Sequence, residues 1–489
     1  MIFYLVRGKI KKTIYDLIRY FSILEVSKAL NHRLLIMSKD TLKENAKQET
    51  FDLFPVKGKA IELQYSGEKV STDGGLLILK EVDNQINIIK EFTGCISDKR
   101  DSRYIDHSVQ EILSQRIFQI AAGYEDALDC NTLKEDAILK LCSNKLPEND
   151  GNLGSQSTMS RFENSVQRSE LYNIAKMFVT QFIKSYTEEP QVIILDADDT
   201  NHNAYGNQLQ IEFNNYYGEY VFMPLHIYEG LSGKLITTIL KPGRRSKSVN
   251  VFAILKRIIE LLRKTWPNTK IILRGDSHFH CPELTSYSKK NDNISFITGL
   301  TGNKRLKELS QVTVDSAERE YNQYKKPVKR YHTFNYKAES WEHEERVIVK
   351  VEVNKMGTNV RYVATDNLDY RTRSIYEMGY SQRGAMELRI KEHKTYLKSD
   401  RTSCHKFEAN QLRLFMHSVA YVLMHTMQKE VLKGTEFVNS TMKTLQLKVL
   451  KTAAKVKELK TKIKIEFPRT FALRDTQTTA FKIFETVRC

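Results

Sequence analysis

Val192-Ile-Ile-Leu-Asp-Ala-Asp-Asp-Thr200 joins a short run of apolar, mostly β-branched residues directly to three carboxylates and a threonine. Such a run is typical of a buried β-strand, which places the acids at its carboxyl end. In open α/β sheets, ligands bind beyond the carboxyl ends of the strands. Asp196, Asp198 and Asp199 would repel one another without a cation to offset their charge. The stretch therefore indicates a divalent-metal site, with a solvated acidic turn as the alternative.

The composition indicates a folded protein with a polyanionic partner. Of the 489 residues, 28% are charged and 41% are hydrophobic, which is typical of globular chains and not of disordered ones. The length allows two or more domains. The formal net charge of +17 favours a nucleic acid as the partner. Composition does not distinguish DNA from RNA.

The cysteines and the apolar segments indicate a reduced compartment and no membrane span. The six cysteines form no Cys-x-x-Cys pair, so a disulfide scaffold or a structural zinc site is not expected. We find no apolar run of about 18 residues, so no membrane contact is predicted. The apolar patch at the N-terminus precedes its charges, the reverse of a signal peptide. Met37 is an alternative start, which would make residues 1–36 an upstream extension.

Residues 56–190 are predicted to be mostly helical. The segment 107–123 is amphipathic, and Thr72 or Asp73 could cap a helix that runs through residue 88. A mixed-charge loop covers residues 98–103, and the polar stretch 155–161 could begin a helix that binds phosphates. The region is either a helical DNA-binding domain or a helical cap on the core that follows.

The elements after the acidic stretch follow the order of a ribonuclease H-like fold. Two strands at 220–228 and 234–240 form a predicted hairpin around a glycine-containing turn. A helix at 249–264, a strand at 270–275 ending in Asp276, a helix at 283–290 and a strand at 294–300 follow. The acids thus come after the first and fourth strands of a strand-strand-strand-helix-strand-helix-strand series.

The rest of the chain is predicted to be a β-rich insertion followed by helices. Residues 301–325 are charged and irregular, and strands at 331–336, 346–353 and 359–364 form an antiparallel insertion outside the core sheet. Helices are expected at 373–394, 410–428 and 442–463. The last one carries a lysine face that could follow a phosphate backbone.

Four polar residues share one face of the helix predicted at 373–394. Tyr380, Arg383, Glu387 and Lys394 are spaced by three, four and seven residues. A carboxylate flanked by cations suits a metal ligand whose neighbours bind phosphates. The alternative is an ordinary helix with ion pairs such as Arg383–Glu387.

Asp198, Asp276 and Glu387, the last within Tyr-x2-Arg-x3-Glu-x6-Lys, together resemble a DDE transposase, and more narrowly the insertion-sequence-1380 family. The likeness runs from about residue 60 to 465. Further motifs that carry it are Asp73-Gly-Gly75 with Leu76-Leu77, Ser160-Arg-Phe-Glu-Asn164, Asn214-x-Tyr-Tyr217, Ile390-Lys-Glu392, Ser399-Asp-Arg-Thr-Ser403 and Asn410-Gln411. Relatives commonly have Asp-Asp-Pro and His-Gly after the first aspartate, whereas this chain has Asn201-His-Asn-Ala-Tyr-Gly206.

The resemblance implies a set of site residues and a cofactor. Asp198, Asp276 and Glu387 would hold two Mg²⁺ ions, with Mn²⁺ as a substitute, for cutting element ends and joining them to target DNA. Asp196 is the second choice for the first ligand, and Glu392 is a weaker candidate for the glutamate. The expected DNA-contacting residues are Tyr380, Arg383, Lys394, Arg244 and Arg245.

The resemblance also implies an architecture, partners and a location. We expect an α/β protein with a ribonuclease H-like catalytic core, a β-rich insertion and helical DNA-binding parts at both ends. The predicted segments are an extension at 1–55, a helical DNA-binding region at 56–190, the first part of the core at 191–300, the insertion at 301–370, the second part of the core at 371–430 and a basic helical region at 431–489. Double-stranded DNA, a homodimer and a bacterial cytoplasm, with nucleoid association on DNA binding, complete the prediction.

Other functions fit parts of the sequence. A structure-specific nuclease on the same core would cut DNA without joining it, and a transposase-derived binding protein would have lost catalysis. His278-Phe-His280-Cys281 could contribute to a zinc site, but a second pair of ligands is missing nearby. Adjacent Cys404 and His405 give only weak support for a cysteine hydrolase.

Overall fold

The computed structural model describes residues 50–64, 69–243, 248–368 and 370–488. The chain divides into two compact units, residues 1–68 and 69–489. In the first unit, strands β1 (Thr50–Val56) and β2 (Lys59–Gln64) form an antiparallel hairpin. Lys57 and Gly58 close it with positive φ angles of 51° and 78°, as a tight hairpin turn requires. The division at residue 68 differs from the predicted boundary at 55, which would split this hairpin.

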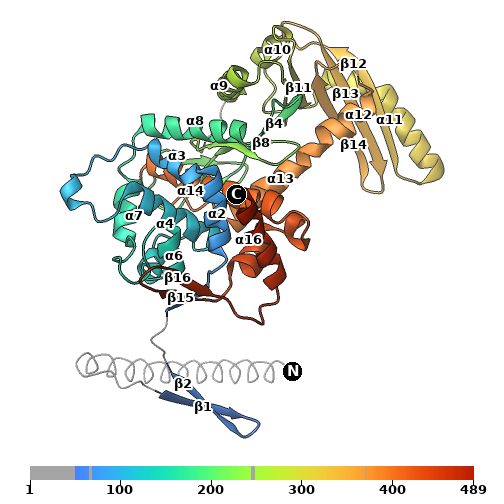
Figure 1. Cartoon of the computed structure of the whole chain (residues 1–489). Coiled ribbons are helices and arrows are strands. Elements are labelled where there is room, and N and C mark those ends of the chain that lie inside the picture. Colours follow the sequence, from blue (N-terminus) through green and yellow to red (C-terminus); the bar gives the residue numbers. More distant parts are fainter. Residues whose placement is uncertain (1–49, 65–68, 244–247, 369, 489) are drawn as a thin grey trace, which may run out of the picture. The chain divides into compact units, whose positions relative to one another are not determined.

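An eight-stranded mixed sheet runs through the second unit (Figure 1). The strand order is β12-β13-β14-β11-β10-β4-β8-β9. The middle strands β4 (Val192–Asp199), β10 (Lys270–Gly275) and β11 (Ile294–Leu300) are parallel, and β8 (Leu225–Glu229) and β9 (Leu235–Ile239) continue the sheet in antiparallel pairing. Strand β4 continues through its acids, so Asp196, Asp198 and Asp199 lie within the strand and not after it.

The strand predicted at 220–228 is interrupted in the middle. Pro224 has no N–H to donate, and the chain changes sheet there. Strand β7 (Glu219–Phe222) pairs with β5 (His202–Asn203) and β6 (Glu212–Asn214) in a small separate sheet, whereas β8 pairs with β4. The predicted hairpin is confirmed for β8 and β9.

The prediction of an insertion outside the core sheet is wrong. Strands β12 (Val328–Tyr336), β13 (Glu345–Asn354) and β14 (Gly357–Thr365) extend the main sheet, because β14 pairs antiparallel with β11. Residues 301–325 are also not irregular, since α11 (Lys304–Tyr324) packs along β12 and β13. Its buried side chains are few, with Leu306 and Ala317 among them, and its other positions are mostly polar.

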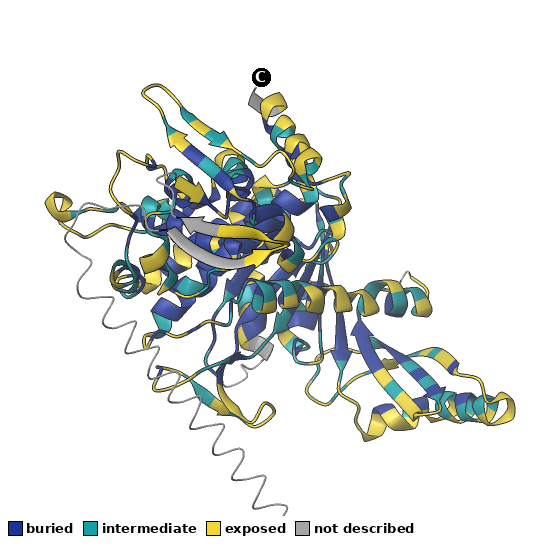
Figure 2. Cartoon of the chain, turned by 90° about the horizontal axis from the view of Figure 1, so that it is seen from below, coloured by how far each residue is buried: buried dark blue, intermediate teal, exposed yellow. Residues whose placement is uncertain are grey.

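Helices cover both faces of the main sheet. Ile193, Leu195 and Ala197 of β4 point into a core shared with α8 (Arg168–Lys184), α9 (Ser248–Thr265), α10 (Pro282–Lys289) and α11. The opposite face contacts α14 (Phe407–Thr426), which continues as a π-helical turn over Met427–Val431, and a helical segment spanning residues 372–396. In Figure 2, the residues coloured as buried lie along this interior, and exposed residues are frequent on the outer helices. The helices predicted at 249–264, 283–290 and 410–428 are confirmed.

The region before β4 is helical, as predicted. After β3 (Lys69–Ser71) come α2 (Leu76–Ile86), α3 (Ile88–Gly94), a 3-10 turn (Ser102–Tyr104), α4 (Val109–Ala122), α5 (Asp129–Leu133), α6 (Ala137–Cys142) and α7 (Gln156–Glu163). Ser108 and Glu111 form a reciprocal capping box at the start of α4. Helix α14 packs against α4, so this region shares a hydrophobic core with the later part of the chain.

The helix predicted at 442–463 ends early. It comprises α15 (Met442–Leu445) and a π-helical turn (Gln446–Leu450), and the chain then forms β15 (Ala454–Glu458) and β16 (Ile463–Glu466) before α16 (Arg474–Arg488). Strand β15 pairs with β3, so the expected helical region at 431–489 is partly a sheet with the N-terminal strand of this unit. The predicted lysine face is therefore not a helix face.

The Asp73-Gly-Gly75 motif, which follows β3, contacts residues 450–452, which precede β15. The N–H groups of Gly74 and Gly75 donate to the carbonyls of Thr452 and Leu450 at 2.8 and 3.1 Å. Asp73 is buried and pairs with Lys451 at 2.6 Å. Its side chain does not cap α2, which begins after Gly75 without a side-chain cap.

Candidate active site

Asp196 lies in a buried ion pair. The side chains of Asp196 and Asp198 share one face of β4 because side chains alternate along a strand. The neighbouring strand β10 supplies Arg274, whose Nε and Nη2 donate to the two oxygens of Asp196 at 2.5 and 2.6 Å. Both side chains are at most 2% exposed. Arg274 Nη1 also donates to the Gly379 carbonyl at 2.6 Å, which ties β10 to the helical segment 372–396.

Asp198 lies nearer to the surface and accepts a hydrogen bond from a different arginine. Arg383 Nη1 donates to its Oδ2 at 2.9 Å, and the Asp199 N–H donates to its Oδ1 at 3.0 Å. Burial, together with the charges of Asp276 and Asp199, raises the pKa of Asp198 to about 7 against the lowering effect of Arg383. Asp198 therefore occupies a site where negative charge is incompletely compensated.

Asp199 has cationic neighbours of its own. Lys241 Nζ lies 2.6 Å from Asp199 Oδ1, and His278 Nε2 lies 3.8 Å from Oδ2. The side chain of Asp199 is 2% exposed. No local sequence pattern indicates this arrangement, because Lys241 and His278 are far from Asp199 along the chain.

Asp276 follows β10 directly and is held by the turn after it. Its Oδ1 accepts a hydrogen bond from the His278 N–H at 2.8 Å. Gly299 on β11 leaves room for the half-buried Tyr380, because a Cβ there would lie 2.7 Å from the tyrosine hydroxyl and 3.0 Å from the Ser277 nitrogen. Burial raises the pKa of the Tyr380 hydroxyl. Tyr380 therefore packs between β11 and the loop that carries Asp276.

The helix predicted at 373–394 is confirmed, but its turns are irregular. It consists of α12 (Thr372–Ser374), a π-helical turn (Ile375–Tyr380), a 3-10 turn (Ser381–Arg383), α13 (Gly384–Lys391) and a second π-helical turn (Glu392–Tyr396). Lys394 consequently points to the chain after β4, where its Nζ donates to Asn201 Oδ1 at 2.9 Å. Burial lowers the pKa of Lys394.

One cavity of about 610 Å³ brings the three predicted acids together. Its lining is formed by Asp198, Asp199, Thr200, Asn214, Tyr216, Tyr217, Met223, Asp276, Glu387 and Ile390. Glu387 is 62% exposed and accepts a hydrogen bond from Arg383 at 3.3 Å. Arg383 thus bridges the carboxylates of Asp198 and Glu387. Across the described residues, no three His, Cys, Asp or Glu side chains are gathered closely enough to hold a metal ion.

Several other predicted residues lie away from this cavity. Glu392 accepts a hydrogen bond from the Met442 N–H at 2.7 Å and so begins α15. Arg244 and Arg245 lie outside the described residues. His280 contacts Thr298 at 2.8 Å, and Cys404 and His405 have separate partners in Glu163 and the Asn207 carbonyl.

Asn214, Tyr216 and Tyr217 are cavity residues to which the sequence analysis assigned no role. They lie in a stretch, residues 205–220, that contains five aromatic side chains among polar ones. The available signals were the Asn214-x-Tyr-Tyr217 motif and this density of aromatic residues.

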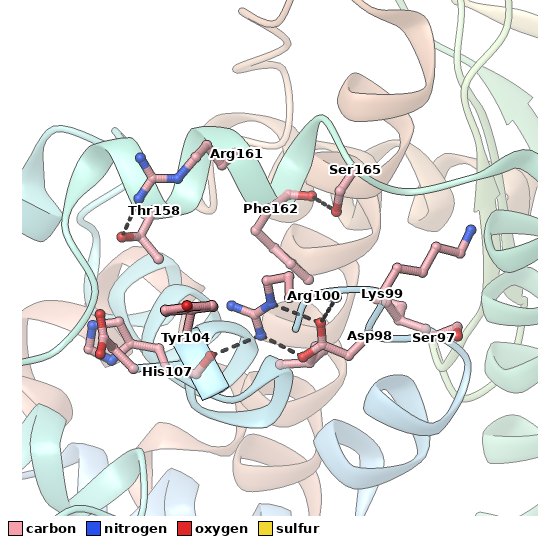
Figure 3. A pocket seen from close by; sticks show the side chains of 13 residues that line it. Ser97, Asp98, Lys99, Arg100, Tyr104, His107, Thr158, Arg161, Phe162 and Ser165 are labelled. Atoms are coloured by element: carbon pink, nitrogen blue, oxygen red, sulfur yellow. Dashed lines mark hydrogen bonds and ion pairs between the residues drawn. The ribbon is translucent and has the colours of Figure 1, made fainter. Parts of the chain in front are cut away.

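A second cavity, of about 420 Å³, lies among the N-terminal helices (Figure 3). It joins the two polar stretches noted in the sequence, 98–103 and 155–161. Arg100 is held by Asp98 through Nε–Oδ1 and Nη2–Oδ2 contacts of 2.8 and 2.6 Å. Lys99 and Arg161 also line the cavity, and neither forms an ion pair with a residue in the described ranges. The cavity therefore presents cations beside the rings of Tyr104 and Phe162.

No helix in the described ranges is long and apolar enough to cross a membrane. The family model described as "Transposase DDE domain group 1" matches residues 53–489. No curated protein matches the chain. Among solved structures, a piggyBac transposase synaptic complex with hairpin DNA aligns with a TM-score of 0.41 and 13% identity, covering 79% of this chain and 83% of that one.

Proposed function

The chain belongs to the group 1 family of DDE transposase domains, and from this premise we propose that it cuts DNA at the ends of an insertion element and joins the 3′ ends to target DNA. The observation that carries the proposal is the single cavity lined by Asp198, Asp276 and Glu387. These acids come from β4, the turn after β10 and α13, three elements far apart in sequence. Their convergence on one cavity favours a shared function over three separate structural roles.

The oxygen donors of Asp198, Asp276 and Glu387 suit Mg²⁺ or Mn²⁺ chemically, and binding an ion would have to draw together carboxylates that this structure holds apart. Carboxylate oxygens are the ligands that these hard cations prefer. The raised pKa of Asp198 supports cation binding, because a divalent ion would compensate the charges that now oppose its ionisation. Asp198, Asp276 and Glu387 would hold the ions, whose chemistry would be activation of the attacking oxygen and stabilisation of the leaving oxygen.

The neighbouring residues have positioning roles in this proposal. Arg383 holds the carboxylates of Asp198 and Glu387 near each other, at 2.9 and 3.3 Å from its guanidinium nitrogens. Lys394 donates a hydrogen bond to Asn201 and thereby holds the chain that follows Asp198 in place. Contact of Tyr380 and Arg383 with DNA phosphates or bases stays part of the proposal.

The strand order supports a ribonuclease H-like core. The strands β9-β8-β4-β10-β11 have the antiparallel and parallel pairings expected for the predicted strand-strand-strand-helix-strand-helix-strand series. We assign the helices before β4, with the second cavity and its unpaired Lys99 and Arg161, to DNA binding. A homodimer on paired ends, a bacterial origin and membership of the insertion-sequence-1380 family belong to the same proposal, the last supported by the quoted motifs.

The test is metal-dependent cleavage of DNA that carries the two ends of the element encoding this chain. Wild type would be compared with Asp198→Asn, Asp276→Asn and Glu387→Gln, each assayed for DNA binding, cutting and joining. The matched control is Glu392→Gln, because Glu392 lies on the same helical segment but contacts Met442 and not the cavity. We expect the three cavity variants to lose at least about 10³-fold in cutting while still binding DNA, and the control to keep activity.

The same assay separates the alternatives. Cutting without joining by wild type would favour a structure-specific nuclease. Binding without cutting, in Mg²⁺ and in Mn²⁺, would favour an inactive transposase-derived DNA-binding protein. Full activity in Asp276→Asn and Glu387→Gln would contradict the proposed site. Calorimetric Mn²⁺ titration of the DNA-free protein gives an independent measurement, because binding should weaken in the same three variants.

A further inference from the structure

The small sheet formed by β5, β7 and β6 exposes several aromatic side chains. Tyr216 is 88% exposed, and Phe213 and Tyr220 are 53% and 57% exposed. Large apolar side chains gathered on a surface in this way mark a binding site more often than chance exposure does.

The turn that carries Tyr216 is fixed by hydrogen bonds. The Asn214 carbonyl accepts from the N–H groups of Tyr217 and Gly218 at 3.2 and 2.8 Å, and the Asn214 side chain accepts from the Tyr216 N–H at 3.0 Å. Gly218 has a φ of 69°, in the left-handed region that favours glycine. Asn214 Nδ2 also donates to the Gly243 carbonyl at 3.4 Å, which anchors the turn to the chain after β9. Tyr216 is thus presented on an ordered turn.

This turn forms one wall of the acidic cavity. Asn214, Tyr216 and Tyr217 line it together with Asp198, Asp276 and Glu387. The rings of Tyr216 and Tyr217 meet edge to face, with centroids 4.9 Å apart and an interplanar angle of 89°. Tyr217 therefore braces the exposed ring of Tyr216 at the mouth of the cavity.

We propose that Tyr216, braced by Tyr217, is a stacking platform for an unpaired nucleobase of the DNA strand whose phosphate enters the acidic cavity. The inference rests on the proposed function. The carboxylates of the cavity repel the phosphates of the DNA. A neutral aromatic ring beside these carboxylates can still hold the strand, because it binds the uncharged face of a base. Stacking tolerates any base, which suits an enzyme acting where strands separate.

The chemistry of the surface favours a base over a protein partner. A second copy of the chain would need an apolar area much wider than one four-residue turn to bind stably. The Asn214 amide is engaged in holding the turn, so the exposed ring of Tyr216 is what the turn offers to a ligand, and a flat ring suits the face of a base. A change of oligomeric state on substitution of Tyr216 would show that this argument is wrong.

The experiment uses the full chain without divalent ions and needs no catalysis. The probe is a DNA duplex with a three-nucleotide 3′ overhang that carries 2-aminopurine, and its fluorescence and anisotropy are followed during titration with protein. Stacking on tyrosine should quench the fluorescence. We expect quenching with wild type, its loss in Tyr216→Ala with about tenfold weaker binding, and its retention in Tyr216→Phe.

Tyr205→Ala is the matched control. Tyr205 is 81% exposed and lies in the same stretch of chain, but it does not line the cavity. The inference is overturned if wild type binds the probe without quenching, if Tyr216→Ala behaves as wild type, or if Tyr205→Ala loses as much binding. It is also overturned if gel filtration shows that Tyr216→Ala changes the oligomeric state.

The outcomes remain distinct from those of the cleavage assay. Metal-dependent cutting by wild type together with unchanged stacking in Tyr216→Ala would overturn the platform alone and leave the proposed function standing. Failure of wild type to bind either the overhang or a blunt duplex would overturn both.

Discussion

Replacing Arg274 by methionine tests whether Asp196 is a structural acid and not a metal ligand. The guanidinium makes two hydrogen bonds to Asp196, at 2.5 and 2.6 Å, and both side chains are at most 2% exposed. Arg274→Met keeps most of the apolar stem but leaves the Asp196 carboxylate buried without its partner. Removing one member of a buried ion pair costs about 3–5 kcal/mol, since the remaining charge stays desolvated. We expect a loss of stability of that size.

A double variant that removes both members of the ion pair completes the test. In the double variant Asp196→Leu/Arg274→Met, neither charge remains to be desolvated, so most of the loss should be recovered. Recovery will be incomplete, because the Gly379 carbonyl also loses the donor that now lies 2.6 Å away.

Urea unfolding followed by tryptophan fluorescence is a suitable measurement. The chain has two tryptophans, and Trp266 is 3% exposed beside β10, with edge-to-face contacts to Phe182 and Tyr186 at 5.7 and 5.3 Å. Its emission therefore reports on the sheet that contains the ion pair. A change within about 1 kcal/mol for Arg274→Met, or a double variant no more stable than the single one, would refute the reasoning.

Three further predictions concern charge, packing and DNA binding. Burial and nearby carboxylates raise the pKa of Asp198 from 3.8 to about 7, so the folded protein binds this proton more tightly than the unfolded chain, and the metal-free protein should lose on the order of 4 kcal/mol of stability as the pH rises from about 4 to 7. Urea unfolding across this range should show that the unfolding free energy falls less steeply with pH in Asp198→Asn than in wild type. An equal pH dependence in the two proteins would contradict the assignment. Gly75→Ala should destabilise the fold by at least about 3 kcal/mol, because its Cβ would lie 2.0 Å from a carbonyl oxygen, whereas Gly94→Ala, which meets nothing within 4 Å, should unfold in urea as wild type does. Arg161→Glu should weaken DNA binding, measured by anisotropy, and lower the slope of log affinity against log salt concentration by about one. The control is Lys307→Glu at an exposed position on α11, which should change neither quantity. Equal effects of the two substitutions would show that the second cavity is not part of the DNA-binding surface.

Local sequence patterns were sufficient for the elements that bury their own apolar face. The parallel strands β4, β10 and β11 are continuous apolar runs, and α4, α9 and α14 carry enough apolar side chains to be recognised without a partner. Asp198 and Asp276 line one cavity because the parallel strands β4 and β10 end at the same edge of the sheet, and Glu387 joins them from helix α13. How these acids act stays a prediction.

Elements that depend on distant partners were mispredicted or missed. Local periodicity predicts a helix where strand β15 lies, although Ala454 and Val456 alternate with polar residues, because the pairing partner β3 lies more than 380 residues earlier. Helix α11 has few buried side chains and borrows its apolar contacts from β12 and β13, so its own sequence looks irregular.

The sequence alone determined which side chains could do metal and phosphate chemistry and which strands would carry them, since both follow from residue type and short-range periodicity. It could not separate Asp196 from Asp198, because the two differ only in what lies opposite them. Arg274 on the adjacent strand holds Asp196 in a buried ion pair, whereas Asp198 pairs with Arg383 and lines the cavity. Tyr216 likewise gains significance only because tertiary folding brings its turn beside the acids. Contacts between residues far apart in the chain decide these assignments, and no local pattern encodes them.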